Sequence, residues 1–148
     1  MTTVKKSLIF MVIAMTSLLS GCEQERVDEQ MQELCDKDGG IKIYEKVELP
    51  KEKFTENGDL TFFVTYNVSS GGYYFETKDE KLRENSPTLT RYTYTITRES
   101  DKKILGTYVY YLRIGGAIFP RLGPDPAKQC PSNLSDRIFK RAIFFPSK

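Results

Sequence analysis

The sequence predicts an α+β fold: one N-terminal helix packed on an antiparallel β-sheet of about five strands, with a short helix or strand at the C-terminal end. Two observations support this prediction. An amphipathic helical pattern comes first in the chain. Strand-like runs separated by turn signals follow it, without the regular alternation of strands and helices that is typical of a parallel sheet.

The helix is predicted over residues 25–37, and Gly39-Gly40 supplies its end. Its apolar residues recur at helical spacing and form one narrow stripe, which consists of Val27, Met31, Leu34 and Cys35. A stripe this narrow predicts a helix that lies on the surface of the domain.

The strand-like runs are bounded by proline, glycine and asparagine. They are residues 41–49, which end at Pro50, residues 60–68, which follow the turn signal at 56–59, residues 73–77, and the two arms of 91–114. The last apolar segment, residues 136–145, has helical spacing with Ser135 as a possible cap, and a final strand is the alternative.

The clearest unit is the hairpin of residues 91–114, which turns near residues 100–102. The loop length decides which faces meet, and we choose a three-residue loop because it separates two kinds of side chain onto two faces more cleanly than an even-numbered loop does. One face is predicted to carry Tyr92, Tyr94, Ile96, Ile104, Tyr108, Tyr110 and Leu112, and the other Thr93, Thr95, Thr97, Thr107 and Val109.

The tyrosines are the one compositional feature that points to a binding surface, because such rings suit recognition of sugars or proteins. The candidates are Tyr73, Tyr74, Tyr92, Tyr94, Tyr108 and Tyr110. We favour the alternative that the four hairpin tyrosines form the buried face of the sheet and that the N-terminal helix covers them.

Residues 1–21 have the order of an export signal. Lys5 and Lys6 precede an apolar run over residues 8–19, and Ser20 and Gly21 follow it. A dozen residues at a helical rise of about 1.5 Å span about 18 Å, short of the roughly 30 Å of a bilayer core. A transmembrane helix is therefore the weaker interpretation.

The end of this signal, Leu19-Ser20-Gly21-Cys22, resembles the lipobox of bacterial lipoproteins. The resemblance implies cleavage before Cys22 and attachment of that residue to a membrane through lipid, with an ordinary secretory signal as the alternative. In enteric-type lipoproteins an Asp after the cysteine resembles an inner-membrane retention signal. Because this chain has Glu23 there, the resemblance favours the outer membrane, facing the periplasm, over the inner membrane. Residues 38–50 are also similar to short uncharacterised lipoproteins of Gram-negative bacteria.

With Cys22 used by lipid, Cys35 and Cys130 remain. An even remainder in an oxidising compartment predicts one disulfide between them. A redox-active pair is the poorer alternative, because neither cysteine belongs to a Cys-x-x-Cys motif.

Residues 22–148 are expected to form one small domain, with residues 22–25 as a very short tether. Loss of the signal removes two of the 22 basic side chains and none of the 20 acidic ones, so the mature chain is formally neutral. A neutral exported chain lacks the basic surplus that binds phosphate backbones, so no nucleic acid partner is expected.

The sequence has no histidine, which excludes Ser-His-Asp and Cys-His catalysis and His-based zinc sites. No glycine-rich stretch has the spacing of a phosphate loop. We therefore expect no enzymatic activity, no cofactor and no metal site. A carboxylate-based hydrolase stays as an alternative, because 20 acidic side chains are present.

Together these features predict a lipid-anchored periplasmic envelope protein that binds an envelope protein or a cell-wall component without chemistry. A more specific alternative is an inhibitor of a cell-wall hydrolase of the lysozyme type. In that alternative the loop at residues 69–73 would enter the active-site cleft of the hydrolase.

Overall fold

A computed structural model describes residues 23–62, 66–116 and 126–148 of the chain. The predicted signal peptide and Cys22 lie outside the described residues. Within them, no helix combines the length and apolar character that a membrane span requires.

The predicted α+β class is confirmed: a helix over residues 23–38 is followed by an antiparallel sheet and a short C-terminal helix. The later elements are β1 (Gly40–Ile43), β2 (Val47–Leu49), the 3-10 helix η1 (Lys51–Lys53), β3 (Val68–Ser70), β4 (Tyr73–Arg83), β5 (Thr88–Arg98), β6 (Ile104–Ile114), β7 (Ala127–Cys130), α2 (Asp136–Ile143) and β8 (Phe144–Pro146). The C-terminal segment is thus both a helix and a strand. Glu23 to Glu25 are already helical, so the predicted tether over these residues is wrong.

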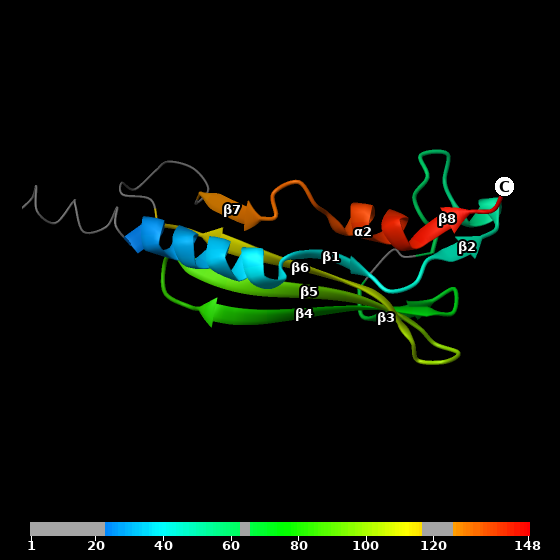
Figure 1. Ribbon diagram of the computed structural model, residues 1–148, viewed down its shortest axis with the longest axis horizontal. Coiled ribbons are helices and arrows are strands. Elements are labelled where there is room, and N and C mark those ends of the chain that lie inside the picture. The colour runs from blue at the N-terminus through cyan, green and yellow to red at the C-terminus, as the bar shows by residue number, and fades with distance from the viewer. Residues whose placement is uncertain (1–22, 63–65, 117–125) are drawn as a thin grey trace, which may run out of the picture.

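The main sheet has the strand order β1-β6-β5-β4-β3, and β7 also pairs with β6. The three long strands β4, β5 and β6 run along the long axis of the molecule (Figure 1). β1 and β7 share one edge of β6, because β1 pairs with residues 106–109 and β7 with residues 111–114. β2 and β8 form a separate parallel pair near the C-terminal end.

The predicted register of the hairpin is confirmed, since Tyr92 pairs with Tyr110 and Tyr94 with Tyr108. Near the turn the predicted register is wrong, because the pairing shifts after Ile96 and Thr97 pairs with Ile104. This irregularity turns Leu105 into the core and leaves Ile104 45% exposed. Ile104 is therefore not a member of the buried aromatic face.

Two buried clusters lie on opposite faces of the sheet, because Tyr108 and Val109 are neighbours on β6 and belong to different clusters. The N-terminal helix buries Val27, Met31 and Cys35 against Leu89, Val109, Tyr111 and Cys130. α2 and β8 bury Phe139, Ile143 and Phe144 against Tyr73, Phe75, Tyr94, Ile96, Leu105 and Tyr108. The expectation that the N-terminal helix covers the hairpin tyrosines is wrong, because that helix packs on the other face.

The predicted strand over residues 41–49 is two strands in two sheets. The N–H groups of Tyr44 and Glu45 both donate to the carbonyl oxygen of Leu105, at 2.8 and 3.1 Å, and β1 ends there. The carboxylate of Glu45 then holds Arg98 at 2.5 Å. The chain leaves the main sheet at this point and pairs β2 with β8.

The predicted strand over residues 60–68 is wrong in its described part, because residues 61–62 and 66–67 are bends and only Val68 belongs to a strand, β3. β4 is longer than predicted and β7 is unpredicted. The outer half of β4 is rich in charged side chains, which are Glu76, Lys78, Asp79, Glu80, Lys81 and Arg83. β3 pairs only with Tyr73 to Phe75, so this half forms an edge within the described sheet. Charges on an edge strand oppose pairing with another chain.

Candidate functional site

The hairpin tyrosines form a stack across β5 and β6, which we call the tyrosine ladder (Tyr92, Tyr94, Tyr108 and Tyr110). The ring centroids of Tyr92 and Tyr110 are 4.9 Å apart at an interplanar angle of 11°, and those of Tyr94 and Tyr108 are 5.8 Å apart at 15°. The ring faces are therefore turned to each other. The hydroxyl ends are left as the groups that the ladder offers to a ligand.

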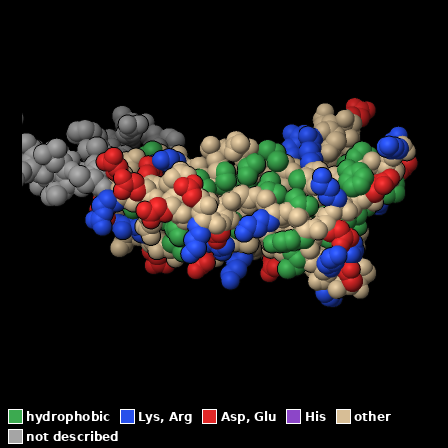
Figure 2. All heavy atoms as spheres, viewed as in Figure 1, with side chains coloured by type: hydrophobic (Ala, Val, Ile, Leu, Met, Phe, Trp, Pro, Cys, Tyr) green, Lys and Arg blue, Asp and Glu red, His purple; other side chains and the backbone are tan. Residues whose placement is uncertain are grey.

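A small cavity of about 150 Å³ lies against the ladder and is called here the tyrosine pocket. Three ladder residues form one side, β7 contributes a second side, and the start of α2 closes it. The lining residues are Tyr94, Tyr108, Tyr110, Gln129, Leu134, Ser135 and Asp136. Figure 2 shows hydrophobic side chains gathered over the α2 and β8 region, and charged side chains around the N-terminal helix.

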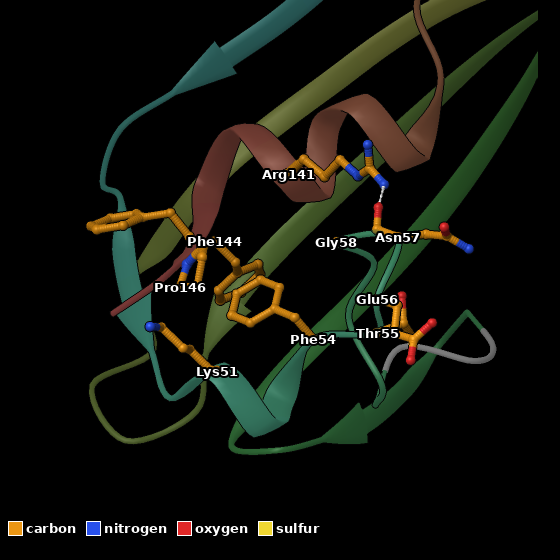
Figure 3. A pocket seen from close by; sticks show the side chains of 10 residues that line it. Lys51, Phe54, Thr55, Glu56, Asn57, Gly58, Arg141, Phe144 and Pro146 are labelled. Carbon is orange, nitrogen blue, oxygen red and sulfur yellow. Dashed lines mark hydrogen bonds between the residues drawn. The ribbon is translucent and has the colours of Figure 1, made fainter. Parts of the chain in front are cut away.

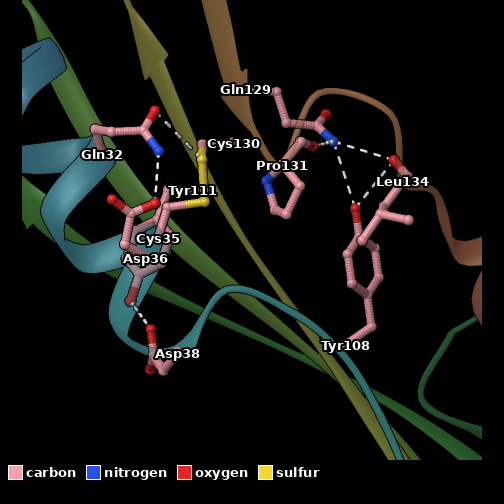
Figure 4. Close-up of a disulfide and its surroundings, with 10 residues drawn as sticks. All are labelled: Gln32, Cys35, Asp36, Asp38, Tyr108, Tyr111, Gln129, Cys130, Pro131 and Leu134. Carbon is pink, nitrogen blue, oxygen red and sulfur yellow. Dashed lines mark hydrogen bonds between the residues drawn. A yellow bond between two sulfur atoms is a disulfide. The ribbon is translucent and has the colours of Figure 1, made fainter.

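Hydrogen bonds fix the wall between β7 and α2 (Figure 4). The Tyr108 hydroxyl donates to the carbonyl oxygen of Leu134 at 3.1 Å. The Gln129 amide donates to the same carbonyl at 3.3 Å and to the Tyr108 hydroxyl at 3.4 Å. Ser135 caps α2, because its hydroxyl oxygen accepts from the N–H of Ile138 at 3.4 Å.

Polar groups at the mouth are close enough to act together. The hydroxyl oxygens of Tyr94 and Tyr110 are 3.5 Å apart. The Asp136 carboxylate accepts from Tyr66 at 3.4 Å and from Lys140 at 3.1 Å. Burial raises the pKa of Tyr108 to about 12, with smaller effects from Tyr94 and Asp136. The Tyr108 phenol therefore stays protonated near neutral pH and keeps its donor bond to the Leu134 carbonyl.

The six tyrosines of the predicted binding surface do not share one site. Four form the ladder. Tyr73 packs in the core, with its ring 4.9 Å from that of Phe144. Tyr74 follows Tyr73 on β4 and so lies on the opposite face.

Sequence reasoning missed Gln129, Ser135 and Asp136 as parts of the pocket. They come from a segment that reads as a loop and from the first turn of a short helix, and no spacing pattern connects them to the hairpin. Only the pairing of β7 with β6 brings Gln129 beside Leu112 and so next to the ladder.

The lining supplies hydrogen-bond donors, acceptors and one carboxylate, that of Asp136. No group of three or more acidic or cysteine side chains in the described parts of the chain is placed to hold a metal ion. The arrangement is thus suited to holding a polar molecule. Glycoside hydrolysis would require a second carboxyl group facing the first.

Comparison with known proteins finds no matching family model, no similar curated protein and no similar solved structure.

Proposed function

We propose that this protein is a lipid-anchored protein of the bacterial envelope that binds a glycan of the cell wall in the tyrosine pocket, without catalysing a reaction. The anchoring part rests on the lipobox-like sequence at residues 19–22. The binding part rests on one observation, the group of phenol, amide and carboxylate groups that line a single small cavity.

The lining favours a neutral ligand rich in hydroxyl and amide groups. Such a ligand both donates and accepts, and the pocket offers the hydroxyls of Tyr94 and Tyr110 and the carboxylate of Asp136. Tyr108 and Gln129 hold the wall through their bonds to the Leu134 carbonyl. Leu134 adds an apolar wall. A volume of about 150 Å³ suits one sugar ring and is below the size of a drug-like site.

An inhibitor of a cell-wall hydrolase has less support. The predicted loop at residues 69–73 is a tight turn of two residues, Gly71 and Gly72, because Ser70 of β3 pairs directly with Tyr73 of β4. The two glycines adopt φ of 64° and 85°, which such a turn requires. A turn this tight has little reach into a cleft.

Binding is tested by sedimentation of the purified full-length protein with peptidoglycan sacculi. Tyr110→Phe removes one pocket hydroxyl and should weaken binding about three- to tenfold. Tyr92→Phe is the matched control, because Tyr92 belongs to the ladder and does not line the pocket. Equal binding by both variants, or no binding by the wild type, would contradict the proposal.

Anchoring is tested separately by growth with labelled palmitate. The wild type should be labelled, and it should accumulate as an uncut precursor when the lipoprotein signal peptidase is inhibited. Cys22→Ser should abolish labelling. An unlabelled wild-type protein in the soluble periplasm would refute the anchor and would leave the glycan proposal to its own test.

A further inference from the structure

A second, larger cavity lies at the end of the molecule where α2, β8 and η1 meet. Its volume is about 430 Å³. Figure 3 shows it between the segment that follows η1 and the C-terminal elements. Its lining residues are Lys51, Phe54, Thr55, Glu56, Asn57, Gly58, Arg141, Phe144, Phe145 and Pro146. It shares none of them with the tyrosine pocket.

The centre of this cavity is apolar and aromatic. Phe144 is 2% exposed and belongs to the core, and Phe54 packs against the same cluster. Phe145, in contrast, is 40% exposed, which is unusual for a phenylalanine in a strand. An apolar group in the cavity would cover this ring and remove its surface from water.

The rim of the cavity carries two cationic side chains and one acidic side chain. Arg141 lies on one side, where it donates to the carbonyl oxygen of Asn57 and lies 3.1 Å from Asp59. Lys51 comes from the other side, and no ion pair in the described residues involves it. Glu56, the single acid of the lining, lies at the other end of the cavity from Lys51 in Figure 3. A ligand that covers the aromatic centre would therefore bring its polar end to a cation.

We propose that this cavity binds a small amphipathic anion, an aryl or acyl group that carries a carboxylate, with the carboxylate at Lys51 and the apolar group on Phe54 and Phe145. The site is separate from the tyrosine pocket. It does not depend on glycan binding or on the lipid anchor.

The test uses three probes with the same apolar group and different charges: 2-naphthoate, 2-naphthol and 2-naphthylmethylamine. Each is titrated by calorimetry into the purified full-length protein, with the matching buffer as the blank. 2-Naphthoate should bind most tightly and the amine least. Lys51→Gln should weaken 2-naphthoate about three- to fivefold and leave 2-naphthol unchanged.

Two variants make the test specific. Lys53→Gln changes a lysine of the same 3-10 helix that does not line the cavity, and should leave all three affinities unchanged. Phe145→Ala should weaken all three probes, since it removes part of the shared apolar contact. No binding of 2-naphthoate, equal affinity for the three probes, or an equal response to Lys51→Gln and Lys53→Gln would overturn the proposal.

Discussion

The two faces of the sheet are built in different ways. The face under the N-terminal helix is closed by covalent and charged links between distant parts of the chain: a disulfide joins Cys35 to Cys130, with Cα atoms 6.0 Å apart (Figure 4). The face under α2 is held by aromatic packing and leaves cavities at the ladder and beside β8. The first face thus fixes a helix to the sheet, and the second contains the cavities in which we propose that ligands bind.

The charged links on the first face are unusually well enclosed. Arg113 is 3% exposed, and its guanidinium donates to Asp28 at 2.9 Å and to the carbonyl oxygens of Gly115 and Pro126 at 2.7 and 3.0 Å. At the other end of the helix, Asp38 accepts from Arg91 at 2.8 Å and from Tyr111 at 2.5 Å. Both ends of the helix are thus tied to the sheet.

The largest effect is expected from breaking the disulfide. Cys35→Ser frees a loop of 95 residues in sequence separation. It should lower the free energy of unfolding by about 4–5 kcal/mol in the chain-entropy model. Thermal unfolding with and without reductant measures this loss, and Cys35→Ser with Cys130→Ser should match the single variant. Two free thiols in the oxidised protein would refute the pairing.

A smaller loss is expected from the buried arginine. Arg113→Met removes the donor to Asp28 and to two carbonyl groups, and should cost about 2–3 kcal/mol in denaturant unfolding. Lys128→Met is the matched control, because Lys128 contacts the same Asp28 at 3.3 Å from an exposed position. If the two variants lose equal stability, the burial of Arg113 does not determine how much this side chain contributes to the free energy of unfolding.

On the opposite face, Gly106→Ala should weaken the docking of α2. A Cβ atom at this position would lie 2.9 Å from Cδ1 of Ile143 and 2.9 Å from the carbonyl oxygen of Lys42. Overpacking of this kind costs about 1–3 kcal/mol. Chemical denaturation measures the loss, with Thr107→Ala on the other face as the control. An unchanged midpoint would show that α2 can shift without cost.

Acid should loosen the face under the N-terminal helix. Burial raises the pKa of Asp28 and Asp38, but hydrogen bonds from Arg113 and Lys128, and from Tyr111 and Arg91, outweigh it and hold both pKa values below the ordinary value. The folded state therefore gains stability above the ordinary aspartate pKa and loses it as pH falls through the lowered values. As pH is lowered from neutral, the midpoint of thermal unfolding should fall less steeply for Asp38→Asn than for the wild type. The same slope in wild type and variant would contradict this.

The smallest effect on stability is expected from Tyr110→Phe. Its hydroxyl lies 3.5 Å from that of Tyr94, a long contact, so unfolding should change by less than about 0.5–1 kcal/mol. Thermal unfolding of this variant, measured beside the sacculi assay, separates the two roles. A large loss of stability would mean that the ladder hydroxyls hold the fold.

The sequence predicts the parts of this fold that have a local pattern. The helix stripe of Val27, Met31 and Cys35 is buried as expected, and the alternation of the hairpin fixes its register away from the turn. The irregularity that buries Leu105 has no local pattern, because it depends on the pairing of Thr97 with Ile104.

The candidate site was half predictable. The ladder tyrosines follow from alternation on two neighbouring strands. Gln129 and Asp136 do not, since β7 is a short strand in a region rich in proline and glycine, and its place is set by pairing with β6. Which helix covers the ladder also depends on tertiary packing. The sequence therefore predicted the N-terminal helix over these tyrosines, whereas α2 packs on that face.

The docking of the helix from its first described turn sets how this domain would meet a membrane. Glu23 already pairs with Arg83 of β4 at 2.5 Å. With lipid on Cys22, as we propose, the docked helix would follow the lipidated residue directly, without a flexible linker between the domain and the bilayer. α2 and β8 lie at the end of the molecule opposite the start of the helix (Figure 1). The cavities near α2 and β8 would then lie at a constant distance from the bilayer surface. The protein would meet its ligands by lateral diffusion in the plane of the membrane.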